Sequence, residues 1–186
     1  MKRARAQFFS ALALLFASIL SIFAQATVGQ KYQIAFADVD GNSLSTADGR
    51  VNVVVVTSQA NIDKARAVGD RTPDFCLANP SYRMITVVEF ETKHTAPIRA
   101  VARSVIRHRL NSEAHRLKNR YDKLKITRDA RRDVFAVADF DGTIATQLGL
   151  KSDAALFHVF VFGKGGELLK QWSEAPNADE LEAALR

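Results

Sequence analysis

Residues 51–61, VNVVVVTSQAN, decide the fold class of this chain. The run of valines from Val51 to Val56 is typical of a central strand that is buried on both faces of a sheet. Polar residues 57–61 end that strand, and the residues after them favour a short helix over 61–68, which stops at Gly69. A strand that turns directly into a helix predicts the beginning of an α/β sheet.

Strands and helices alternate along the rest of the chain. Further strands are predicted at 32–37, 83–90, 134–138, 157–162 and 167–172, and the last two form a hairpin through a glycine-rich turn. Helices are predicted at 97–125, 143–148 and 178–185, with Asn177 and Glu180 as a capping box for the last. The long helix should bury one apolar stripe, made of Ile98, Val101, Val105, Leu110, Ala114, Leu117, Tyr121 and Leu124. This order indicates an α/β protein with a mixed sheet and helices on both faces.

The N-terminus has the pattern of a targeting segment. Positive charges at Lys2, Arg3 and Arg5 precede an uncharged apolar run, residues 8–23, and an Ala-Gln-Ala sequence at 24–26. We therefore predict a signal peptide at 1–26, a single domain at 27–186 and a periplasmic or secreted location. An uncleaved membrane anchor is the alternative, although the run is short for a span of about 20 residues. No transmembrane segment is expected after cleavage.

Cys76 is the only cysteine in the chain, so no internal disulfide can form. A reactive thiol needs a lowered pKa, whereas neighbouring Asp74 would raise it, and Phe75 and Leu77 suggest burial. A structural thiol is the prediction. A peroxidatic cysteine, a metal ligand and an intermolecular disulfide stay open as alternatives.

Several segments resemble parts of a known superfamily. Residues 36–51 are similar to an opening β-hairpin, residues 138–150 to a strand with a short helix, residues 160–167 to a late hairpin, and residues 179–185 to a terminal helix. Together they resemble the thioredoxin-like superfamily, especially its exported peroxiredoxin-type and cytochrome-maturation-type branches. The resemblance implies a thioredoxin-like mixed sheet with an N-terminal β-hairpin and helices on both faces.

Two departures from that superfamily bear on function. The resemblance implies redox cysteines at the turn 57–61, where this chain has none and where Ala60 has no lone pair for nucleophilic attack. It also implies a cis-proline before the fourth strand of the family, but residues 153–158 contain no proline, so a trans connection is predicted. We therefore expect no catalytic residue, no cofactor and no metal site.

A second motif has two interpretations. Asp139, Asp141, Gly142 and Thr143 match the D-x-D-G-T pattern of haloacid-dehalogenase-type phosphatases, in which the first aspartate is the nucleophile. Only 42 residues follow Ile144, which is too few for the remainder of such a phosphatase. The alternative is a turn at the end of a strand.

The strongest positive signal is charge. The whole chain has a net charge of +6, and residues 93–132 contain thirteen Lys or Arg against three acids. Such segregation attracts anionic partners, here an envelope component or an acidic protein. Nucleic acid is not expected, because Tyr121 is the only aromatic residue in the segment that could stack on a base. The predicted binding residues are Arg103, Arg107, Arg109, Arg116, Lys118 and Arg120. The alternative is a solvated helix face that is balanced by acids elsewhere in the chain.

Two functional hypotheses follow from these features. The first is a non-catalytic binding or adaptor domain of the cell envelope that lacks a C-x-x-C site. The second is a single-cysteine thiol-disulfide oxidoreductase or peroxidase that uses Cys76. The position of Cys76, well after the strand-to-helix turn, favours the first.

Overall fold

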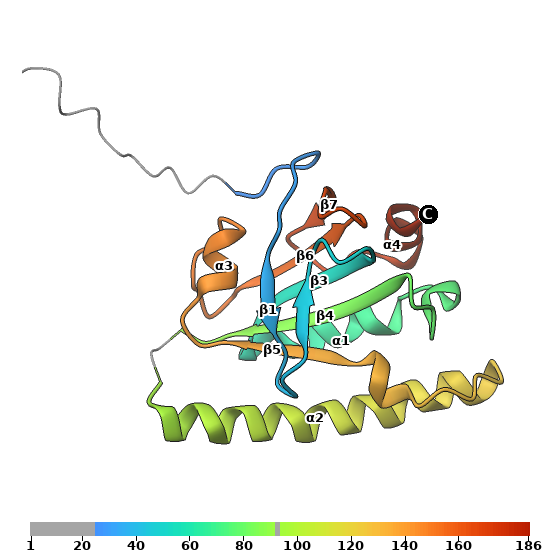
Figure 1. The fold of residues 1–186 in the computed structure, drawn as a ribbon, viewed down its shortest axis with the longest axis horizontal. Helices are drawn as coiled ribbons and strands as arrows, with labels where there is room; N and C mark the ends of the chain where they lie inside the picture. The colour runs from blue at the N-terminus through green and yellow to red at the C-terminus, as the bar shows by residue number, and fades with distance from the viewer. Residues whose placement is uncertain (1–24, 92–93) are drawn as a thin grey trace, which may run out of the picture.

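The computed structural model describes residues 25–91 and 94–186, so the predicted signal peptide lies almost wholly outside the described residues. A five-stranded sheet runs through the molecule in the order β5-β4-β3-β6-β7 (Figure 1). Its central strand is β3 (Val51–Ser58), which pairs in parallel with β4 (Tyr82–Glu89) and antiparallel with β6 (Phe157–Phe162). At the two edges lie β5 (Phe135–Asp139), parallel to β4, and β7 (Leu168–Trp172), antiparallel to β6.

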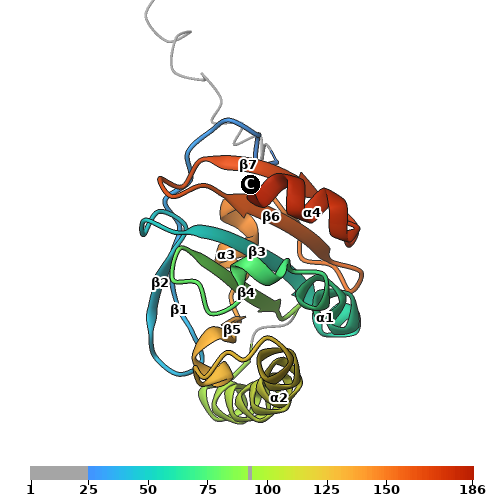
Figure 2. The ribbon, with the colours of Figure 1, turned by 90° about the vertical axis from the view of Figure 1, so that its right-hand side faces the viewer.

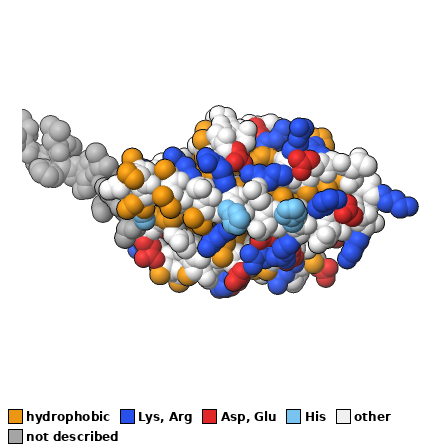
Figure 3. Space-filling view, turned by 90° about the horizontal axis from the view of Figure 1, so that it is seen from below, with side chains coloured by type: hydrophobic (Ala, Val, Ile, Leu, Met, Phe, Trp, Pro, Cys, Tyr) orange, Lys and Arg blue, Asp and Glu red, His pale blue; other side chains and the backbone are white. Residues whose placement is uncertain are grey.

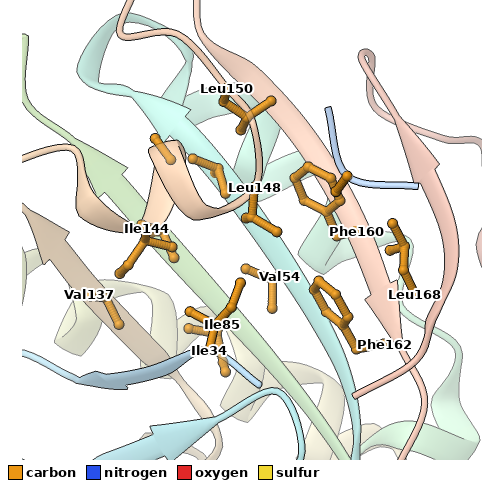
Figure 4. Packing of buried hydrophobic residues seen from close by; sticks show 14 of the residues in the cluster. Ile34, Val54, Ile85, Val137, Ile144, Leu148, Leu150, Phe160, Phe162 and Leu168 are labelled. Carbon is orange, nitrogen blue, oxygen red and sulfur yellow. The ribbon is translucent and has the colours of Figure 1, made fainter. Parts of the chain in front are cut away.

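The valine run occupies the centre of the sheet because its side chains are apolar on both faces of the strand. Val53 and Val55 point into one apolar layer and Val54 and Val56 into the other, as the two-residue period of a strand requires. Figure 4 shows Val54 among aromatic and aliphatic side chains from neighbouring strands and from the short helix. The prediction of a strand buried on both faces is confirmed.

Helices cover both faces of the sheet, as predicted. The helices α1 (Ile62–Asp70) and α4 (Ala178–Leu185) pack with Val53 and Val55 on one face. The short helix α3 (Thr143–Gln147) packs with Val54 and Val56 on the opposite face. Figure 2 shows α1 and α4 on one side of the sheet and the N-terminal strands on the other. The capping box of α4 is confirmed, because Asn177 and Glu180 exchange hydrogen bonds of 2.8 and 2.9 Å.

The N-terminal hairpin consists of β1 (Ala35–Ala37) and β2 (Ser43–Ser45), which form a separate two-stranded sheet. The Asp38 carboxylate accepts hydrogen bonds from two backbone N–H groups and one side chain of the turn, so this short polar sequence folds locally. β1 is shorter than predicted because Tyr32 bonds to Gly166 instead of continuing the hairpin. Upstream of it, Ala26 is buried against α3.

The long helix α2 (Ala96–Lys123) lies along β5, on the same face of the sheet as α1. Its predicted apolar stripe is partly wrong. Leu110, Ala114 and Tyr121 are buried together with Ile106, but Ile98, Val101, Val105 and Leu124 are exposed and Leu117 is half-buried. The reason is that the helix packs through the face that carries Ile106, so the side chains of its first turns project beside the sheet rather than onto it. None of the helices within the described residues is both long and apolar enough to cross a lipid bilayer.

Three one-turn 3-10 helices complete the described part of the chain. They are η1 (Gln59–Asn61) directly after β3, η2 (Asp74–Cys76) after α1, and η3 (Ala130–Asp133) before β5. Their positions matter for function, because η1 occupies the strand-to-helix turn and η2 carries the single cysteine.

Candidate functional site: the strand-to-helix turn and the groove beside α2

The turn after β3 is held by ordinary structural bonds. The Ser58 hydroxyl donates to the carbonyl of Ala154 at 2.6 Å, and Asn61 reaches the carbonyl of Leu156 at 3.4 Å. Gln59 and Ala60 are exposed at its tip. All peptide bonds of the described residues are trans, which confirms the trans connection predicted before β6. The turn therefore presents an amide and a methyl group to solvent where a thiol would be needed for redox chemistry.

Cys76 lies on the other side of α1, in η2. Its side chain is 8% exposed and packs with Ala65, Val68 and Leu185. Burial, with a smaller contribution from the negative charge of Glu182, raises the pKa of the Cys76 thiol to about 12. Because the thiolate is the nucleophile, a thiol that stays protonated at neutral pH is unreactive. This environment is the one expected of a structural thiol.

The D-x-D-G-T motif forms the junction of β5 and α3. Both oxygens of the Asp139 carboxylate accept backbone N–H bonds, from Thr143 and Ile144 at 2.9 Å and from Ala145 at 3.1 Å. Asp141 instead makes two hydrogen bonds to Arg99. Asp139 is thus a capping residue of the turn. Of the two interpretations of the motif, the structure supports the turn at a strand end.

Glu89, which belongs to no motif of the sequence, lies beside Asp139 in the register of β4 and β5. It is 2% exposed, the Ser152 hydroxyl donates to its Oε1, and its Oε2 has no hydrogen-bond partner among the described residues. Burial, and to a lesser degree the charges of Asp139 and Glu91, raises the pKa of the Glu89 carboxyl. The signal that could have found it is an acidic residue inside the otherwise apolar run 84–90.

A groove of about 780 Å³ separates α1 from α2, and β4 forms its floor. In Figure 2 α1 lies at the right of the sheet and α2 at the bottom of the view, below β5. One end is lined mainly by apolar side chains, Ile62, Val88, Ile98, Val101 and Val105. The other end is lined by charged side chains, Arg66, Asp70, Glu113, Arg116 and Arg120. In Figure 3 hydrophobic side chains gather at the end where α2 begins, whereas Lys, Arg, Asp and Glu share the remainder of that face.

The structure divides the six predicted binding residues between different surroundings. Arg109, Arg116 and Arg120 line the groove, whereas Arg103, Arg107 and Lys118 do not. Lys118 borders a second, more polar cavity between α2 and residues 125–131.

Most of these cations are already engaged within the chain. Arg107 donates to the carbonyl of Val39 at 2.8 Å and lies 3.5 Å from Asp40. The ion pairs Arg116 to Asp70, Lys118 to Asp122 and Arg120 to Asp74 measure 2.7, 2.7 and 2.6 Å. The alternative interpretation, a basic helix face whose charge is balanced by acids elsewhere in the chain, therefore holds for these four basic residues.

The other two cations have no acidic partner among the described residues. The guanidinium of Arg103 lies over the ring of Phe140, 5.4 Å from its centre. Arg109 makes no hydrogen bond, ion pair or ring contact with the described part of the chain. These two arginines supply the uncompensated positive charge among the six.

No protein-family sequence model matches the chain, and no curated protein sequence matches it. Solved structures do. A secreted thiol-disulfide isomerase from Corynebacterium glutamicum has 13% sequence identity and a TM-score of 0.52, with coverage of 84% of this chain and 83% of the isomerase. A putative thiol:disulfide interchange protein DsbE from Chlorobium tepidum has 13% identity and a TM-score of 0.51, covering 87% and 100%.

The pneumococcal exposed lipoprotein thioredoxin from Streptococcus pneumoniae has 16% identity and a TM-score of 0.50, covering 83% and 98%. At such identities the likeness concerns the fold alone. The chain has a thioredoxin-like fold, as its sequence predicted, and it has no cysteine at the turn that follows the central strand.

Proposed function

We propose that this chain is a non-catalytic binding protein of the cell envelope, built on a thioredoxin-like fold that has no redox site. The observation that carries the proposal is that no reactive thiol lies on the surface of the described chain. The exposed turn at Gln59 and Ala60 has no thiol, and the single thiol of Cys76 is buried with a raised pKa. A fold without its reactive group still offers surfaces for binding.

The binding surface that we propose is the exposed face of α2, and its partner is an anionic envelope component or an acidic protein. Arg103 and Arg109 carry positive charge that no acid of the described chain neutralises. Long-range attraction depends on such uncompensated charge, whereas arginines already in ion pairs add little to it.

An exported location belongs to the same proposal. The basic, apolar and small-residue pattern of residues 1–26 supports it. The similar structures include proteins described as secreted and as an exposed lipoprotein, which is consistent with export.

The test measures the binding of the purified domain, residues 27–186, to phosphatidylglycerol vesicles and to immobilised polyglutamate at low and high salt. The double variant Arg103→Gln/Arg109→Gln should lose most of the binding. The matched control Lys164→Gln/Lys170→Gln removes two exposed charges around the β6–β7 turn and should bind normally. If both double variants lost the same amount of binding, the net charge of the protein alone would explain the effect, and this would contradict a binding face on α2.

The thiol hypothesis is tested in the same preparation. Peroxide consumption and disulfide reduction by the domain should be no faster than by its Cys76→Ala variant. Turnover that depends on Cys76 would overturn the non-catalytic proposal and support a single-cysteine oxidoreductase or peroxidase.

A further inference from the structure

The groove between α1 and α2 has an apolar end, a charged end and one cation at the boundary between them. We propose that it binds a free long-chain carboxylate, with the alkyl tail along the first turns of α2 and the carboxylate at Arg109. This inference rests on the proposed function, since it names a ligand class for the same face of α2.

The apolar end exposes side chains that a folded protein usually covers. Ile98, Val101 and Val105 are 50, 64 and 46% exposed, and all three line the groove. Their spacing of three and four residues places them on one face of the helix. Removing that contiguous apolar surface from water would be favourable, and an alkyl chain is the simplest ligand that does so.

The polar end shows where the tail must stop. Arg109 follows Val105 by one helical turn, so it continues the same line along α2. From Ile98 to Arg109 the helix rises about 16 Å, which is the length available to an extended alkyl chain. Beyond Arg109 the groove is lined by ion-paired residues. An alkyl chain that extended farther would cover these ion pairs and remove water from them, which is unfavourable.

Charge complementarity selects a single anionic headgroup. Arg66 is paired with Glu113 at 2.8 Å, and Arg116 is paired with Asp70 at 2.7 Å. Arg109 precedes Glu113 and Arg116 along α2 and has no partner among the described residues. One carboxylate on Arg109 would neutralise one charge, and the planar guanidinium can bind it with two parallel hydrogen bonds.

The depth of the groove favours a single ligand molecule over a bilayer surface. Its volume of about 780 Å³ lies within the range of about 300–1,000 Å³ that is typical of small-molecule sites. Its floor at the apolar end includes Val88 of β4, which packs with Ile106 of α2. A flat membrane would touch the helix rims, whereas a chain inside the groove would also touch Val88.

Calorimetric titration of the domain, residues 27–186, with monomeric octanoate, dodecanoate and dodecanol tests the proposal. Dodecanoate should bind at least tenfold more tightly than octanoate, because the tail contributes apolar contact, and at least tenfold more tightly than dodecanol, because the headgroup contributes charge. Arg109→Gln should abolish the preference for carboxylate over alcohol. The matched control Arg132→Gln removes an exposed arginine that does not line the groove and should leave both affinities unchanged.

A second variant and a second measurement locate the ligand. Val101→Asp places a carboxylate in the apolar end at an exposed position, so the fold should be retained while dodecanoate binding is lost. With labelled valine methyl groups, the Val88 signals should shift in NMR spectra when dodecanoate binds, because Val88 lines the apolar end of the groove. Circular dichroism confirms that each variant is folded.

Three outcomes would overturn the proposal: absence of dodecanoate binding, equal affinity for dodecanoate and dodecanol, or an Arg132→Gln effect as large as that of Arg109→Gln. Binding to phosphatidylglycerol vesicles without a Val88 shift would also overturn it, in favour of a membrane surface, and would leave the proposed function standing. The proposed function itself is contradicted if the domain binds none of the three probes: vesicles, polyglutamate or dodecanoate.

Discussion

The phenol of Tyr121 donates a hydrogen bond to Oδ2 of Asp133 at 2.8 Å. The same phenol oxygen accepts the backbone N–H of Ala78 at 3.1 Å. Tyr121 is almost fully buried near the C-terminal end of α2, whereas Asp133 belongs to η3 and Ala78 follows η2. One side chain thereby fixes the C-terminal end of α2 to two loops, while the first turns of the helix leave Ile98, Val101 and Val105 exposed along the groove.

Tyr121→Phe should lower the free energy of unfolding by about 1–3 kcal/mol, because it leaves Asp133 and the N–H of Ala78 without this partner in a partly buried place. Urea unfolding measures the change. Tyr82→Phe is the matched control, since the Tyr82 hydroxyl makes no hydrogen bond to the described residues, and it should change the stability little. Equal effects of the two variants would contradict this account of Tyr121.

Alkylation of Cys76 should be much slower in the folded domain than in urea at pH 8. The reason is that burial raises the pKa of its thiol to about 12, so almost no thiolate is present. Iodoacetamide labelling followed by mass spectrometry measures both rates. Similar rates in the two conditions would show that the thiol is accessible and would revive the thiol hypothesis.

The same pKa predicts how stability depends on pH. Between about pH 9 and pH 12 the unfolded chain loses the Cys76 proton while the folded chain keeps it, so folding becomes less favourable as the pH rises. The Cys76→Ala variant lacks this contribution. Its stability should therefore fall less steeply than that of the wild type over this interval, as measured by urea unfolding at each pH.

Glu89→Gln should stabilise the protein at neutral pH. The pKa of the buried Glu89 carboxyl is raised above its usual value near 4.5, so the wild type is stabilised by protonation at low pH and loses this contribution as the pH rises through the folded-state pKa. The variant should therefore gain stability relative to the wild type between pH 4 and pH 8. A constant difference across this range would mean that Glu89 titrates normally.

Gly166→Ala should destabilise the chain by about 2–3 kcal/mol, because Gly166 has φ +81° and a Cβ there would lie 2.5 Å from the carbonyl oxygen of Tyr32. The neighbouring Gly165 has ordinary φ, and no atom lies within 4 Å of the place that a Cβ would take there, so Gly165→Ala is the matched control. Thermal unfolding of the two variants compares them directly. A similar melting temperature for both would contradict the close approach.

The local sequence pattern was sufficient to predict where the main strands and helices lie. The strand Phe157–Phe162 and the capping box at Asn177 lie where the sequence predicts them, because strand composition and helix capping act between near neighbours. The error at Val101 and Val105 has an equally physical origin. Periodicity shows that a helix has an apolar face, but it does not show which part of that face meets the sheet.

The candidate site was predictable only in part. The absence of a cysteine at the turn is visible in the sequence, and so is the concentration of arginines on α2. That Arg116 has a partner in Asp70 while Arg109 has none among the described residues depends on pairs far apart in the chain. Glu89 was missed for the same reason, since its neighbours Asp139 and Ser152 are brought to it only by the fold.

By itself the sequence determined that this is an α/β chain with a thioredoxin-like order of elements and without redox cysteines at its turn, because valine runs, capping residues and missing thiols are local properties. Only the tertiary structure decided that Cys76 is buried, that four of the six basic residues are neutralised, and that a groove between α1 and α2 has an apolar end and a charged end. Burial, ion pairing and cavities arise between segments that are distant in sequence, and their geometry exists only once α1, α2 and the sheet are packed together.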